Sequence, residues 1–206
     1  MVDLNKVQLT KASPTVNLAK GAGAGGRMRV NLNWDQSAGA GQKGGLFGRK
    51  KSGGIDLDLA ALWETTDGSK GVVQALGNSF GSLDTPPYVF LDGDDRSGTN
   101  TEGENLLINL DHLGQLRRVL VFAFIYEGAP AWADANGVVT LYPQGAAPIE
   151  IRLDEANRSA RTCAIALLTP QDGGLTVNRE VRYINGFQQD LDQAYGWGMN
   201  WSAGRK

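Results

Sequence analysis

Segments in which apolar and polar residues alternate recur along almost the whole of this 206-residue chain. That two-residue period places apolar side chains on one face of a β-strand and polar side chains on the other. The clearest alternating strands are expected over residues 28–34, 55–63, 149–153 and 175–184. Continuous apolar runs predict two strands buried on both faces, over residues 119–126 and 162–169. Shorter strands are expected over residues 7–10, 72–76, 106–110 and 138–142.

Glycine-rich turns separate these strands, since glycine makes up 28 of the 206 residues, about twice its usual share. Roughly ten short strands joined by such turns predict an all-β fold, a two-sheet β-sandwich that forms a single domain over residues 1–206. One short C-terminal helix is expected over residues 186–195, where apolar side chains recur at helical spacing. Trp197 and Trp201 are expected to pack against that helix.

Net charge and residue counts exclude several classes of function. Twenty basic and 22 acidic side chains leave a net charge of −2, so no specific nucleic acid partner is expected. The only cysteine, Cys163, excludes an intramolecular disulfide and favours a reducing compartment. The only histidine, His112, excludes zinc sites with several histidines. We find no targeting signal and no apolar run near the roughly 20 residues that span a bilayer, so a soluble, cytoplasmic protein is expected.

Charge is distributed unevenly along the chain. Residues 26–52 carry six basic side chains and one acid, whereas residues 55–111 carry 11 acids and two bases. Seven glycines and the cluster Arg49-Lys50-Lys51 predict a flexible Gly-rich loop over residues 38–54, with a basic arm that contacts phosphates or an acidic partner as the alternative. A phosphate-binding P-loop is excluded, because Lys50 stands where the motif requires glycine.

Asp56 and Asp58 lie two residues apart on an expected strand. Residues at that spacing share a face, with Cα atoms about 6.6 Å apart, and Leu57 and Leu59 take the core face. Two carboxylates this close repel each other unless water or a cation lies between them. The pair is therefore either part of a solvated outer face or half of a cation site, and Glu64 further along the strand is expected to be a bystander.

A second loop is expected over residues 83–105, and its acidic segment, residues 91–105, combines carboxylates with glycines that allow tight turns. Hard cations such as calcium take six to eight oxygen ligands, and loops of this composition provide them. An EF-hand is excluded, because Arg96 and Ser97 occupy positions that the motif reserves for a ligand and a glycine. The carboxylates of this segment are Asp92, Asp94, Asp95, Glu102 and Glu104.

The chain resembles the TerD family of bacterial tellurium-resistance and stress-response proteins, over residues 7–198. Asp-Leu-Asp at residues 56–58 and Gly-Asp-Asp-Arg-Ser-Gly at residues 93–98 are specific in combination. The stretch 98–104 is shorter and less acidic than in the family. The Gly-rich insert 38–54 and residues 78–89 also differ from a standard TerD, which favours a TerA-like or divergent member. The other matching segments are Val7-Gln-Leu-Thr-Lys11, Val30-Asn-Leu-Asn-Trp-Asp35, Ile108-Asn-Leu110 and Arg118-Val-Leu-Val-Phe-Ala123.

The resemblance implies a calcium-binding, non-enzymatic module with protein partners of the Ter type and peripheral association at the inner membrane through those partners. Two alternatives remain: an interaction or scaffold protein with a degenerate metal site, and a metal-dependent enzyme that acts on a phosphate-bearing substrate. Trp132 is expected in a loop, and Cys163 is expected to be an inert core thiol. The metal ligands that the resemblance implies are Asp56, Asp58, Asp94, Asp95, Glu102 and Glu104.

Overall fold

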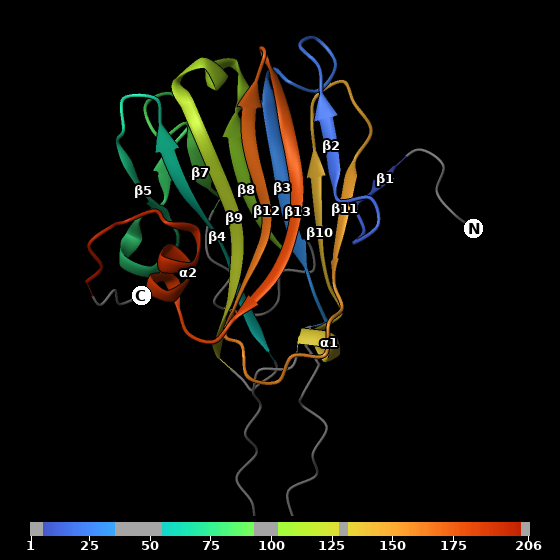
Figure 1. Ribbon diagram of the computed structural model, residues 1–206, viewed down its shortest axis with the longest axis vertical. Coiled ribbons are helices and arrows are strands. Elements are labelled where there is room, and N and C mark those ends of the chain that lie inside the picture. Colours follow the sequence, from blue (N-terminus) through green and yellow to red (C-terminus); the bar gives the residue numbers. More distant parts are fainter. Residues whose placement is uncertain (1–5, 36–54, 93–102, 128–131, 203–206) are drawn as a thin grey trace, which may run out of the picture.

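The computed structural model describes residues 6–35, 55–92, 103–127 and 132–202, which form two facing β-sheets (Figure 1). Almost all strand pairs are antiparallel, and β1 pairs in parallel with β11. Sheet A has the strand order β1 (Val7–Gln8), β11 (Ile149–Leu153), β10 (Gly137–Tyr142), β3 (Arg27–Asn33), β8 (Glu104–Asn109), β7 (Val89–Leu91), β6 (Gly81–Ser82). Sheet B has the order β2 (Thr15–Leu18), β13 (Gly174–Ile184), β12 (Thr162–Gln171), β9 (Leu116–Glu127), β4 (Asp56–Thr65), β5 (Lys70–Val73).

The main core lies between the two sheets and follows from the alternation in the sequence. In β3, Met28, Val30 and Leu32 are fully buried, whereas Arg27 and Arg29 on the opposite face are exposed. The same period places alternate residues of β4 and β9 in this core. The predicted all-β sandwich with one short C-terminal helix is therefore confirmed, with α2 at Gln188–Tyr195.

Each strand expected from the sequence is present, with bounds that shift by a few residues. Two expectations were wrong. Residues 83–105 are not one continuous loop, because β7 lies within them and pairs with β8. Trp132 is not an exposed loop residue: it begins α1 (Trp132–Ala135), is fully buried, and its Nε1 donates to the Ala160 carbonyl oxygen at 2.9 Å. Short 3₁₀ helices also form at Leu76–Asn78 and Leu110–Gln115.

The outer face of sheet B carries a second apolar cluster, which the C-terminal segment (residues 188–201) covers. Leu191 of α2 and Trp197 contribute to this cluster, and Trp197 is only 1% exposed. The sheet side chains beneath this cover come from three neighbouring strands: Ala60, Leu62, Leu120, Phe122, Phe124 and Ala164. This cover explains why β9 and β12 are apolar on both faces.

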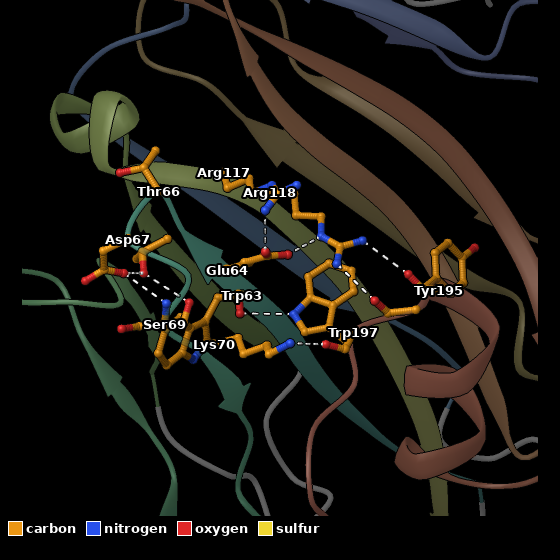
Figure 2. Close-up of polar contacts among 12 residues, drawn as sticks. Trp63, Glu64, Thr66, Asp67, Ser69, Lys70, Arg117, Arg118, Tyr195 and Trp197 are labelled. Carbon is orange, nitrogen blue, oxygen red and sulfur yellow. Dashed lines mark hydrogen bonds and ion pairs between the residues drawn. The ribbon is translucent and has the colours of Figure 1, made fainter.

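Polar contacts fix the C-terminal segment at the end of α2 (Figure 2). The Arg118 guanidinium stacks 3.7 Å from the Trp197 ring centroid and donates to the carbonyl oxygens of Tyr195 and Gly196. Lys70 Nζ donates to the Trp197 carbonyl oxygen, and Trp197 Nε1 donates to that of Trp63. Both cations lie where a helix C-terminus presents carbonyl groups that lack partners within the helix.

Within α2, the buried Asp192 organises the chain that follows it. Its carboxylate accepts from the backbone N–H groups of Gly198 and Met199 at 2.6 and 2.8 Å. It also accepts from Trp201 Nε1 at 2.8 Å, and Trp197 lies in one apolar cluster with Leu191, so both C-terminal tryptophans pack against the helix as expected. Among the described residues, the structure contains no helix long and apolar enough to cross a membrane.

Candidate cation site

Asp58 lies on the covered outer face of sheet B, near the start of β4. Leu57 and Leu59 point into the main core and Ala60 into the outer cluster, so the alternation directs Asp58 outward. Of the two alternatives, a solvated face does not hold at Asp58, which is only 1% exposed. Asp56 is half-buried, and the register with β9 shifts between Asp56 and Leu57. The extra residue of this irregularity is on β9, because Asp56 pairs with Glu127 and Leu57 with Ile125, so the two-residue period of β4 still places Asp56 and Asp58 on one face.

Glu104 approaches the same stretch of β4 from sheet A. It is opposite Leu32 in the pairing of β3 with β8, on the face that looks into the sandwich, and is 5% exposed. Its Oε2 accepts from the Leu59 backbone N–H at 2.6 Å. That N–H faces the side of β4 where β5 begins to pair only at Ala61. Glu104 therefore binds the peptide group that joins Asp58 to Leu59.

One backbone hydrogen bond joins the two ends of the acidic segment. The Asp92 N–H donates to the Asn105 carbonyl oxygen at 2.9 Å, which holds the end of β7 next to the start of β8. Three of the predicted ligands, Asp94, Asp95 and Glu102, lie outside the described residues, as does the predicted Gly-rich loop 38–54. Within the described residues, no three Asp, Glu, His or Cys side chains form a group that could hold a metal ion.

Glu64, expected to be a bystander, is a buried structural carboxylate instead. It is 6% exposed and accepts from Arg117 Nη1 at 3.0 Å and Arg118 Nε at 2.6 Å (Figure 2). Because Arg118 also binds the end of α2, Glu64 joins β4 to the C-terminal segment through β9. The sequence feature that could have indicated this role is the Arg117-Arg118 pair directly before the apolar run 119–126.

The groups most often used as nucleophile or base are in structural environments. Burial raises the pKa of the Cys163 thiol far above its usual value, so this thiol stays protonated at neutral pH. The His112 ring stacks on Tyr88 with 4.1 Å between centroids, and its Nδ1 lies 3.1 Å from Gln115 Nε2. Neither residue shows the paired nucleophile and base that nucleophilic catalysis requires.

Comparison with known proteins adds one relative that matches the whole chain. The tellurium resistance protein TerA of an Alcaligenes species is 48% identical over all 206 residues. The chain belongs to the Ter family. It spans 60% of the length of that TerA relative.

No family model matches this Ter protein. Its fold is shared by a solved homologue of the telluride resistance protein TerD from Streptomyces coelicolor, with a TM-score of 0.56 and 19% identity. That match covers 85% of this chain and 99% of the TerD homologue. At this identity the likeness concerns the fold, a sandwich common to both.

Proposed function

We propose that this Ter protein is a non-enzymatic, calcium-binding module of a tellurite-resistance and stress response. The observation that carries the proposal is the burial of two carboxylates at the start of β4: Asp58 on that strand, and Glu104, which accepts from the Leu59 N–H. Placing charged carboxylates in a protein interior costs free energy, and a bound cation offsets that cost. The TerA relative, whose name refers to tellurium resistance, supports the biological role.

The ligand set proposed for calcium draws on both acidic pieces of the chain. The backbone pairing of Asp92 with Asn105 brings the ends of the acidic segment to sheet A beside β4. A cation held by both pieces neutralises their negative charge and joins sheet A to sheet B at this point. The proposed ligands are Asp56, Asp58, Asp94, Asp95, Glu102 and Glu104.

Calcium is the proposed ion because every predicted ligand is a carboxylate oxygen on a strand end or a glycine-containing segment. Calcium accepts variable coordination by six to eight oxygens, whereas magnesium requires near-ideal octahedral geometry. Competition binding at equal concentrations should therefore favour calcium. Equal or tighter binding of magnesium would favour the metal-dependent enzyme acting on a phosphate-bearing substrate.

Thermal unfolding with calcium and with chelator tests the proposal. A ligand that binds only the folded state at about 100 times its Kd contributes about 2.7 kcal/mol, or roughly 5–10 °C in Tm for a chain of this size. Asp58→Asn should abolish that rise, because it removes a ligand charge and keeps the side-chain volume. Asp172→Asn, an exposed acid in the turn between β12 and β13, is the matched control and should keep it.

One observation favours the second candidate, an interaction or scaffold protein whose metal site has degenerated. Glu104 already accepts a short hydrogen bond from Leu59, so its carboxylate has a stabilising role that needs no metal. Identical Tm values in calcium and chelator would support this candidate. In either case we propose protein partners of the Ter type, a cytoplasmic location and association with the inner membrane through those partners.

A further inference from the structure

The outermost strands of the two sheets differ in how well they are protected against pairing with another chain. Natural proteins protect edge strands by shortening them, charging them or covering them. In the described residues, β1 and β6 are each two residues long, and β1 follows Lys6, which is ion-paired with Glu150. In β5, Lys70 is bound to the C-terminal segment, and Gly71 lies against the Trp63 ring. Among the strands that the structure describes, β2 is the outermost one without such protection.

Within the part of the chain that the structure describes, backbone groups of β2 are available on the side away from β13. Its four residues are uncharged, and Pro14 lies just before the strand. The Arg179 N–H donates to the Pro14 carbonyl oxygen, and Val16 and Leu18 are opposite Val177 and Leu175. Because hydrogen-bonded and non-hydrogen-bonded pairs alternate, Val16 and Leu18 bond to β13, while the N–H and C=O groups of Thr15 and Asn17 point away from the sheet.

A cavity lies at each end of this edge. At the C-terminal end, a cavity of about 340 Å³ is lined by Asn17, Leu18 and Lys20 together with Asp172 and Thr176. At the N-terminal end, a cavity of about 290 Å³ is lined by Thr10, Lys11, Arg152, Asp154, Glu155 and Arg179. Each cavity carries both signs of charge, and Lys11 is ion-paired with Glu155 at 2.7 Å. The edge therefore offers outward backbone groups in its middle and room for side chains at both ends.

We propose that an extended, uncharged segment of a partner protein adds to sheet B as a strand beside β2. Pairing with Thr15 and Asn17 provides up to four backbone hydrogen bonds, the mode of recognition known as β-augmentation. A second copy of this chain fits less well. A two-fold pairing that matches Thr15 with Asn17 places Lys20 of each copy beside Lys11 of the other, and like charges across neighbouring strands are destabilising.

The first experiment selects binders from a random library of displayed eight-residue peptides, using the full chain as bait. A selected peptide is then synthesised, and its Kd is measured by fluorescence anisotropy. Asn17→Pro removes one outward N–H, at a position where an edge strand tolerates proline. We expect it to weaken binding by about tenfold or more, the equivalent of one hydrogen bond. Asn17→Ala keeps the N–H, is the matched control, and should bind within about twofold of the unmodified chain.

Amide hydrogen exchange on the unmodified chain supplies a second measurement that does not depend on how the proline variant folds. The selected peptide should slow exchange at Thr15 and Asn17 more than at other β2 amides. Equal affinity of Asn17→Pro and Asn17→Ala would overturn the proposal, as would protection elsewhere or failure to select any peptide. A concentration-dependent dimer that Asn17→Pro abolishes would assign the edge to a second copy instead.

Discussion

The outer faces of the two sheets have opposite chemistry. The outer face of sheet B is apolar across β4, β9 and β12, and the C-terminal segment buries it. The outer face of sheet A is polar: Arg29 lies 4.1 Å from the exposed Tyr142 ring centroid, and Arg29 and Asn31 both donate to Asn105 Oδ1 at 3.0 Å. One sandwich therefore contains a sheet packed on both faces and a sheet packed mainly on one.

This difference indicates that the two outer faces contribute unequally to the free energy of unfolding. Each side chain of the covered face is buried between its own sheet and the C-terminal segment. Side chains on the polar face of sheet A exchange contacts with water for contacts with one another, with little net gain. Substitutions on the covered face should therefore lower the free energy of unfolding several times more than equivalent substitutions on the polar face.

Trp197→Ala should produce the largest loss. It removes a fully buried aromatic side chain and the stacking surface of Arg118, so we expect a loss of about 3–5 kcal/mol in the free energy of unfolding. Tyr142→Ala, the aromatic counterpart on sheet A, should cost about 1 kcal/mol or less. Denaturant unfolding measures both. Similar losses for the two variants would contradict the comparison.

Glu64→Gln should have the next largest effect, about 2 kcal/mol, because it leaves Arg118 without its charged partner beneath the C-terminal segment. Glu150 is the residue on sheet A to compare with Glu64, since it also pairs with two cations, Lys6 and Arg152. Both cations are more exposed than Arg118, and neither binds the C-terminal segment as Arg118 does, so Glu150→Gln should cost less than about 1 kcal/mol. Equal costs would show that the cover adds nothing to the Glu64 ion pairs.

The pH dependence of stability gives a further test of the ion pairs that Glu150 makes on sheet A. Burial alone would raise the pKa of Glu150, but the hydrogen bond from Lys6 and the charge of Arg152 outweigh it and lower this pKa below 4.5. A carboxylate with a lowered folded-state pKa contributes stability above pH 4.5, and loses that contribution as the pH falls through its folded-state pKa. Unfolding of Glu150→Gln between pH 3 and pH 7 should therefore depend less on pH than unfolding of the unmodified chain. An unchanged pH profile would show that this ion pair does not stabilise the fold.

Arg29→Gln should have the smallest effect, about 0.5 kcal/mol. It removes a cation–π contact with Tyr142 at an exposed site, where such contacts contribute little. Added salt should reduce the difference between the variant and the unmodified chain. A loss above 2 kcal/mol would mean that the polar face of sheet A is more tightly organised than its exposure indicates.

The fold could be predicted from the sequence because each strand carries a local signal. The alternation in 28–34 and the continuous apolar run in 119–126 respectively predict strands with one and two buried faces, and β3 and β9 have these properties. The position of the cover over β9 could not be predicted, since it depends on contacts between residues more than 60 positions apart, such as Arg118 with Trp197. β2, β6 and β7 were missed because four, two and three residues are too few to establish a period.

The candidate site could be predicted only in part, for the same reason. Spacing directs Asp58 away from the core, but its burial depends on packing that the strand sequence does not encode. The approach of Glu104 to Leu59 joins two sheets, and no local pattern in β8 indicates it. Glu64 was misjudged because a glutamate on an alternating strand has the same signal whether it faces water or a pair of arginines.

The C-terminal segment that covers sheet B, residues 188–201, is synthesised after all the strands of both sheets. A ribosome that adds about 5–20 residues per second completes β9 several seconds before it reaches Trp197. During that interval the apolar side chains of β4 and β9 have no cover, and they offer a surface for chaperones or for other nascent chains. Translation that stops before residue 188 should therefore yield a product that aggregates, although both sheets already have all their strands.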